Sequence, residues 1–178
     1  MNSNTRPSWD SCFAAIAREV AKMGTCSRRL VGCVLVDVNR RILSTGVNGP
    51  PPGWSHCRYE PGAECPGSKS PSGTNLDQCV ANHAEANALI YCQDAARIHT
   101  VYCTTSPCVS CVKMLLCTGA CRIVFEEEYP HKESRELWCR GPATSTDRRG
   151  KVEDHRTWEL FNPEMGKALL LDSSGFKR

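Results

Sequence analysis

Two short motifs bring together residue types that bind a metal ion and move protons. The first is a His-x-Glu motif at residues 83–85, and the second is a Pro-Cys-x-x-Cys motif at residues 107–111. On a helix, cysteines three positions apart place their sulfurs on one face. One imidazole and two thiolates supply three zinc ligands and leave a fourth position open, which is typical of catalytic zinc. We therefore predict a zinc site formed by His83, Cys108 and Cys111.

Glu85 follows the predicted ligand His83 by two residues. A bound Zn²⁺ lowers the pKa of its water to roughly 7, so hydroxide forms near neutral pH. Because a further protein ligand would close the site, we predict that Glu85 carries a proton from this water to a ring nitrogen and then to the departing amine. The combined H-x-E…P-C-x-x-C pattern is the signature of zinc deaminases. A zinc module that keeps these ligands but does no chemistry is the alternative.

A second set of cysteines surrounds a long segment rich in Pro, Gly and Ser, which we call the cysteine loop (residues 49–79). An irregular loop of this length in a compact domain needs a stabilising feature, and a closed zinc site would provide one. The candidate ligands are Cys26, Cys57, Cys65 and Cys79, and His56 could replace one of them. Alternatively, these are buried thiols without a metal. The same core packing is expected for Cys12, Cys33, Cys92, Cys103, Cys117, Cys121 and Cys139.

Helices and strands alternate around these motifs. Apolar periodicity predicts helices at 8–23, 83–95, 108–118 and 131–139, and strands at 31–36, 41–47, 100–104 and 122–126, with 157–161 as a weak strand candidate. This order predicts an α/β fold with one mixed sheet, whose first hairpin is antiparallel and whose later strands are parallel, covered by helices on both faces. We expect a single domain over residues 1–178, ending in a polar extension at 140–178.

The composition favours a protein that binds a small anion. The 178 residues fit one domain, and 40% are hydrophobic, which is enough for a core. The net charge of +3 is mild, and the basic cluster at 148–151 is followed at once by two acidic residues. We therefore expect no nucleic-acid partner. The N-terminus has no signal-peptide pattern and no stretch is apolar enough to span a membrane, so a cytoplasmic protein without a membrane partner is expected.

Together these motifs resemble the deoxycytidylate (dCMP) deaminase family over about residues 8 to 139. The matching pieces are TCSRRLVGC (25–33), GVNGPPPG (46–53), HC (56–57), Cys79 with HAEANA (83–88), TTSPCVSC (104–111) and Tyr129. The resemblance implies a three-layer α/β/α cytidine deaminase-like fold. It also implies hydrolysis of dCMP to dUMP and ammonia, and a second, structural zinc ion.

The resemblance further assigns substrate contacts to Asn48, Ala84, Ser106, Tyr129, Arg28 and Arg29. The asparagine would hydrogen-bond the sugar, and the backbone around Ala84 and Ser106 would hold the cytosine edge together with Glu85. The tyrosine would lie near the pocket, and the two arginines are candidates for the phosphate. Because many family members are hexamers activated by dCTP and inhibited by dTTP, a homo-oligomer and both effectors are expected here.

Alternatives to dCMP deamination stay open at this stage. A base deaminase acting on tRNA or single-stranded DNA shares both motifs but needs basic grooves and aromatic platforms, and only 12 Phe, Trp and Tyr residues are present. Free cytidine deaminases typically have Cys where His83 stands, and riboflavin-pathway deaminases have a longer insertion between the two cysteines. A dCMP modified at C5 is also an alternative substrate, since one methylene discriminates by only about 1–3 kcal/mol.

Overall fold

The computed structural model describes residues 6–71, 74, 78–129, 132–140 and 156–171. The helices are α1 (Trp9–Ala21), α2 (Ala84–Ile90), α3 (Val109–Leu115) and α4 (Lys132–Arg140), with short 3₁₀ helices at Pro66–Lys69 and Ala95–Arg97. The strands are β1 (Gly32–Asp37), β2 (Ile42–Val47), β3 (Ile98–Thr105), β4 (Arg122–Glu127), β5 (Thr157–Asn162) and β6 (Lys167–Leu170). Among these described helices, none has the length and apolar character needed to cross a membrane.

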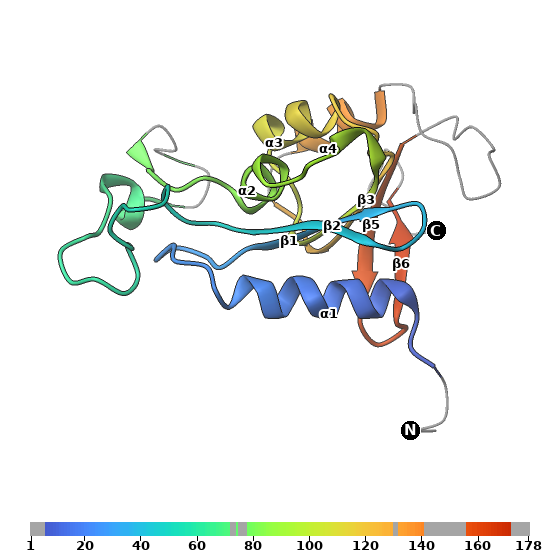
Figure 1. The fold of residues 1–178 in the computed structure, drawn as a ribbon, viewed down its shortest axis with the longest axis horizontal. Helices are drawn as coiled ribbons and strands as arrows, with labels where there is room; N and C mark the ends of the chain where they lie inside the picture. Colours follow the sequence, from blue (N-terminus) through green and yellow to red (C-terminus); the bar gives the residue numbers. More distant parts are fainter. Residues whose placement is uncertain (1–5, 72–73, 75–77, 130–131, 141–155, 172–178) are drawn as a thin grey trace.

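One mixed sheet forms the middle layer, with strand order β2-β1-β3-β4-β5-β6. Strand β1 runs antiparallel to β2 and β3, whereas β3, β4 and β5 are parallel to one another and β6 returns antiparallel to β5. Helix α1 covers one face and α2, α3 and α4 cover the other (Figure 1). The α/β fold and the mixed three-layer arrangement are thus confirmed.

The alternation of side chains along the strands separates two parts of the core. Val34 and Tyr102 pack with Phe13 under α1, while Leu35 and Val101 pack with Val112 on the side of α2 and α3. Every residue of β1 is buried, which explains the apolar run at residues 33–36, and the buried Asp37 at its end is paired with Arg97.

Close backbone packing brings both helix layers onto the sheet. A Cβ at Gly46 would lie 2.2 Å from the carbonyl oxygen of Ala84, so only glycine lets α2 approach β2 this closely. At the other face, a Cβ at Gly32 would lie 2.1 Å from the carbonyl oxygen of Ala17. Helix α1 begins as predicted, with the Ser8 hydroxyl accepting the N–H of Ser11 at 3.0 Å.

Two predictions about the elements were wrong. The helix expected over 83–95 ends at Ile90, since a turn and the 3₁₀ helix Ala95–Arg97 take its place. Strand β6 was not anticipated within the expected polar extension at 140–178, because the apolar run in its sequence KALL is short and lies at the sheet edge. The weak strand candidate at 157–161 is confirmed as β5. The basic cluster at 148–151 lies outside the described residues.

Candidate active site

The two predicted motifs occupy the starts of α2 and α3. His83 is the N-cap of α2 with Glu85 in its first turn, and Cys108 is the N-cap of α3 with Cys111 inside it. Helix α3 follows directly from β3, so both helices deliver their first turns to one end of the sheet. The prediction that each motif begins a helix is therefore confirmed.

The three predicted zinc ligands converge on one point. The ligand atoms of His83, Cys108 and Cys111 all lie within 4.8 Å of one another. The Nδ1 atom of His83 is 3.3 Å from the Cys108 sulfur and 3.4 Å from the Cys111 sulfur. One imidazole nitrogen and two sulfurs are a donor set that Zn²⁺ favours, and they leave a fourth coordination position for water or substrate.

Hydrogen bonding within this cluster separates the proton affinities of its members. The Cys111 thiol donates to Cys108 and, with help from His83, lowers the pKa of Cys108 to about 4. The same contact raises the pKa of Cys111, and a hydrogen bond with Cys108 raises the pKa of His83. Cys108 is thus a thiolate in the metal-free protein, and binding of Zn²⁺ would release protons from its neighbours.

Glu85 lies at the floor of the pocket beside these ligands. Its side chain is almost fully buried, and this burial raises the pKa of the carboxyl group above its ordinary value. A carboxyl group whose pKa is moved toward neutrality can both accept and return a proton. This is the property that the predicted proton shuttle requires.

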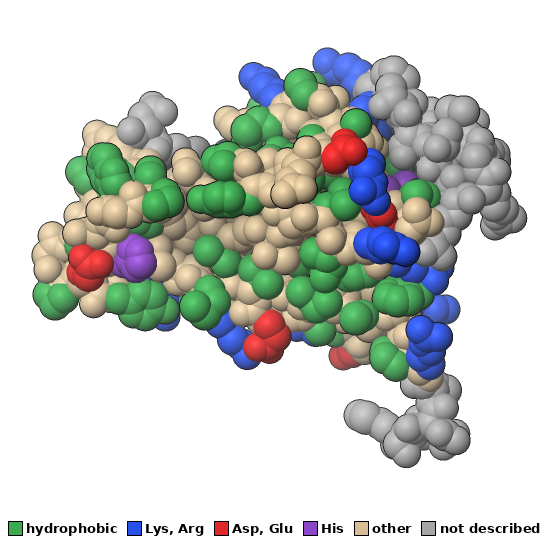
Figure 2. Space-filling model, viewed as in Figure 1, with side chains coloured by type: hydrophobic (Ala, Val, Ile, Leu, Met, Phe, Trp, Pro, Cys, Tyr) green, Lys and Arg blue, Asp and Glu red, His purple; other side chains and the backbone are tan. Residues whose placement is uncertain are grey.

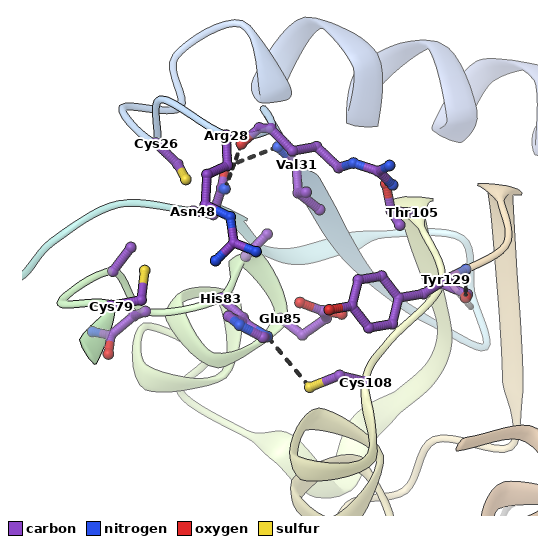
Figure 3. Close-up of a pocket in the computed structure, with 15 residues that line it drawn as sticks. Cys26, Arg28, Val31, Asn48, Cys79, His83, Glu85, Thr105, Cys108 and Tyr129 are labelled. Atoms are coloured by element: carbon purple, nitrogen blue, oxygen red, sulfur yellow. Dashed lines mark hydrogen bonds between the residues drawn. The ribbon is translucent and has the colours of Figure 1, made fainter. Parts of the chain in front are cut away.

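A pocket of about 100 Å³ opens over the ligand cluster. The predicted substrate-binding residues all line it: Asn48, Ala84, Ser106, Tyr129, Arg28 and Arg29. The Tyr129 ring extends into the pocket toward Glu85 (Figure 3), and its backbone N–H donates to the Ser106 hydroxyl at 2.7 Å. The structure therefore gathers these residues at one site, while their contacts with a substrate stay predictions.

Two polar side chains of the pocket, Asn48 and Arg28, already hydrogen-bond to other groups of the protein. Asn48 accepts from the backbone N–H of Val31 at 2.8 Å and donates to the carbonyl of Arg29 at 2.7 Å, so it braces the turn before β1. Arg28 donates to the carbonyl oxygens of Pro71 and Thr74 in the cysteine loop.

Arg29 lies at the other side of the opening. It donates to the Thr105 hydroxyl at 3.3 Å and lies 3.4 Å from the Glu127 carboxylate. Thr105 lies in the family-matching segment TTSPCVSC, but no role was predicted for it, because a pocket threonine there has the pattern of an ordinary strand residue. Asn82, also missed, could have been noticed from its place directly before the first motif.

The second cysteine set also gathers in space. Cys65 hydrogen-bonds with both Cys57 and Cys79, and Cys26 lies near enough to contribute to the raised pKa of each of these two. This grouping is looser than the first, since no three of these sulfurs lie within 4.8 Å of one another. Cys26 and Cys79 also line the pocket. The other candidate, His56, has backbone contacts with Glu60 on the outer part of the loop.

Core packing is only partly correct for the remaining cysteines. Cys33, Cys103 and Cys121 are buried and Cys92 is partly buried. The prediction is wrong for Cys12, Cys117 and Cys139, which are exposed on the outer face of α1, after the end of α3 and in the last turn of α4.

The sequence is similar to that of known deaminases. Residues 7–127 match the family model described as the cytidine and deoxycytidylate deaminase zinc-binding region. A deoxycytidylate deaminase of Mycobacterium phage D29 is 39% identical over 128 residues, which cover 70% of this chain and 98% of the relative. The deoxycytidylate deaminase of Schizosaccharomyces pombe is 40% identical over 129 residues, but the match spans only 38% of that protein.

A solved structure has the same architecture. The dCMP deaminase of cyanophage S-TIM5, in complex with dCMP and dUMP, aligns with a TM-score of 0.57 and 27% identity, covering 75% of this chain and 92% of that one. Fold and site together define a zinc-binding α/β protein of the deaminase type. The chain belongs to the family of cytidine and deoxycytidylate deaminases with this zinc-binding region.

Proposed function

We propose that this protein hydrolyses dCMP to dUMP and ammonia. The observation that carries the proposal is the convergence of three zinc ligands, a buried carboxyl group and two arginines on one pocket. The phage relative that matches over nearly its whole length is a deoxycytidylate deaminase, which supports this substrate. Ammonia release should be measured with dCMP, using deoxycytidine, CMP, 5-methyl-dCMP and dAMP as comparisons. Absence of release from dCMP by zinc-loaded protein would contradict the proposal.

Each part of the pocket has a role in this reaction. His83, Cys108 and Cys111 would hold Zn²⁺, which supplies an activated water at neutral pH when bound. Glu85 would accept a proton from the attacking water and pass it to N3 of the ring as the hydroxide adds to C4. It would then take the proton of the new C4 hydroxyl and give it to the amine, so that ammonia leaves as C4 becomes a carbonyl. Its burial excludes bulk water from these transfers, and Tyr129 limits the opening above it.

Arg29 is the better placed of the two arginines for the substrate phosphate. Two backbone carbonyls already engage Arg28, whereas Arg29 is fixed at the pocket wall by Thr105 and by an exposed ion pair with Glu127 that costs little to break. We expect Arg29→Ala to reduce kcat/KM for dCMP by roughly 10–100-fold, because a charge-assisted contact contributes about 1.5–3 kcal/mol. Deoxycytidine, which has no phosphate, should lose little. Lys22→Ala removes an exposed cation outside the pocket and serves as control; equal losses on both substrates for Arg29→Ala would place it outside the phosphate site.

A second zinc ion in the cysteine loop is supported by backbone donors around its sulfurs. The N–H of Ala81 donates to the Cys79 sulfur, and the N–H groups of Gly67 and Val80 donate to the Cys65 sulfur. Although burial opposes ionisation of Cys65, these and neighbouring thiol contacts lower its pKa, whereas burial raises the pKa of Cys57 and of Cys79. Such donors stabilise the thiolates that a closed zinc site needs.

Metal analysis should accordingly find about two zinc ions per chain. We expect Cys57→Ser to lower this value toward one and to reduce the melting temperature, because structural zinc contributes folding energy directly. Cys117→Ser changes an exposed cysteine and should alter neither quantity. A Cys57→Ser protein that keeps two zinc ions and full stability would remove Cys57 from the ligand set.

A base deaminase of tRNA or single-stranded DNA is the second candidate. On the face drawn in Figure 2, the coloured Lys and Arg side chains lie mainly at the upper rim and along the right-hand side, with acidic side chains beside some of them. Strand binding requires a basic track, whereas a nucleotide needs only a cation for its phosphate, and Arg28 and Arg29 in the pocket lining supply one. The hexamer, the dCTP and dTTP effectors and the cytoplasmic location stay predictions from the family resemblance and the sequence.

A further inference from the structure

We propose that Asn82 binds the 3′-hydroxyl of the substrate's deoxyribose and so helps to select a nucleotide with this group. The inference rests on the proposed function, since it concerns how dCMP is held. Asn82 lies directly before the zinc ligand His83 and lines the same pocket.

The backbone places Asn82 beside the segment that carries Asn48. Its N–H donates to the Gly49 carbonyl at 2.9 Å, and its carbonyl accepts the Gly49 N–H at 3.2 Å. These paired bonds hold the two segments together at the pocket wall. Asn48 in turn contacts the backbone of Arg29, the candidate phosphate residue. Asn82 therefore lies next to the zinc ligand His83, where the cytosine ring would react. Through Gly49 and Asn48 it is also connected to Arg29, where the phosphate would bind.

The two asparagine amides are not equally available to a ligand. The Asn48 amide is largely buried, and both its oxygen and its nitrogen are engaged by the turn before β1 (Figure 3). Within the described part of the chain, no protein group hydrogen-bonds to the Asn82 amide, while its backbone groups are both used by Gly49. At the pocket lining, the Asn82 amide thus keeps its one acceptor and two donors unused by the described protein groups.

The chemistry of dCMP defines what such an amide would recognise. In a nucleotide the sugar lies between the base and the phosphate, so it occupies the middle of the pocket when the ring reaches Glu85. Deoxyribose has no 2′-hydroxyl and its 5′-oxygen is esterified, which leaves the 3′-hydroxyl as its single free hydroxyl. A hydroxyl both donates and accepts, and an amide matches both functions.

The test compares dCMP with 2′,3′-dideoxycytidine monophosphate (ddCMP), which lacks this hydroxyl. We expect the wild-type protein to prefer dCMP and Asn82→Ala to lose about 3–10-fold in kcat/KM for dCMP with little change for ddCMP. Asn48→Ala, which loosens the turn before β1, should weaken both substrates alike. Asn87→Ala removes another amide, one that donates to the Val47 carbonyl, and should show no differential loss either.

Calorimetric binding of dUMP and its 3′-deoxy analogue to the zinc-loaded protein gives a second readout that needs no turnover. Asn82→Leu, close in size to Asn, provides a second variant if the alanine protein folds poorly. Equal losses on both substrates, no loss, or a differential at Asn48 instead of Asn82 would overturn the inference. Wild-type protein that deaminates dCMP and ddCMP equally well would also overturn it while leaving the proposed function intact. A protein inactive on dCMP would contradict the proposed function itself.

Discussion

Replacing Glu85 with glutamine should remove most dCMP turnover while leaving the fold and the zinc in place. Glutamine has nearly the same size and can still hydrogen-bond, but it cannot carry a proton. Cytosine becomes electrophilic at C4 only when N3 is protonated, and the amine leaves only when it is protonated too. Loss of general acid–base catalysis typically costs about 10²–10⁴-fold, and here one carboxyl group serves both steps.

Affinity for dCMP should survive better than turnover, because the lost interaction belongs mainly to the transition state. Zinc content, dCMP affinity and single-turnover rate should be measured on one preparation. Glu133→Gln, in the first turn of α4, is a control for the loss of an acidic side chain outside the pocket. Near-normal turnover by Glu85→Gln with full zinc would show that another group moves the protons.

The catalytic centre was predictable because its chemistry is local in sequence. His83 with Glu85, and Cys108 with Cys111, are close neighbours at the start of a helix, so helix geometry alone aligns each pair. Bringing the pairs together needed only that both helices follow segments at the same end of the sheet. The parallel order of β3, β4 and β5 was predictable for a similar reason, since crossover helices separate parallel strands.

The hydrogen bonds that the pocket side chains make within the protein were not predictable from the sequence. Nothing in the sequence indicates that Asn48 braces the turn before β1 or that Arg28 bonds to carbonyls more than 40 residues away. The Arg28 contacts depend on how the cysteine loop folds, and that loop has no hydrophobic periodicity from which its path could be predicted. Asn82 was overlooked because its backbone pairing with Gly49 joins segments without regular secondary structure.

The contribution of the C-terminal strands to the core was also not predicted from the sequence, for a different reason. The expected polar extension contains Trp158 and Phe161, both buried, so β5 completes the core on both faces of the sheet. Thr157 and Glu159 at alternate positions make the segment look solvent-facing, although both are engaged within the protein. Glu159 is the main example, since its carboxylate binds Arg122 of β4 instead of solvent.

Arg122 is the centre of a largely buried ion cluster that joins α1, β4 and β5. Its guanidinium lies 2.8 and 3.0 Å from the two carboxylate oxygens of Asp10, and 2.9 and 2.5 Å from those of Glu159. The Tyr102 hydroxyl completes the cluster by donating to Asp10 at 2.7 Å. Burial by itself would raise the pKa of Asp10, but the hydrogen bonds and charge of Arg122 outweigh it and lower that pKa.

Arg122→Met should therefore lower the free energy of unfolding by about 3–5 kcal/mol at neutral pH, because it leaves two carboxylates without their partner. In the wild-type protein, the pKa of Asp10 is lower in the folded state than its ordinary value of 3.8. The Asp10 ion pair therefore contributes fully to the free energy of unfolding at pH values above 3.8, and this contribution is lost as the pH falls through the folded-state pKa. The stranded carboxylates of the variant can be neutralised by protonation, so its deficit should shrink in acid. Urea unfolding at several pH values would measure both effects.

Arg18→Met is the control, because it removes a more exposed ion pair with Glu126 and should lower the free energy of unfolding by no more than about 1 kcal/mol. If Arg122→Met lowered the free energy of unfolding by a similarly small amount at every pH, the ion cluster would not be what holds α1 and β5 against β4.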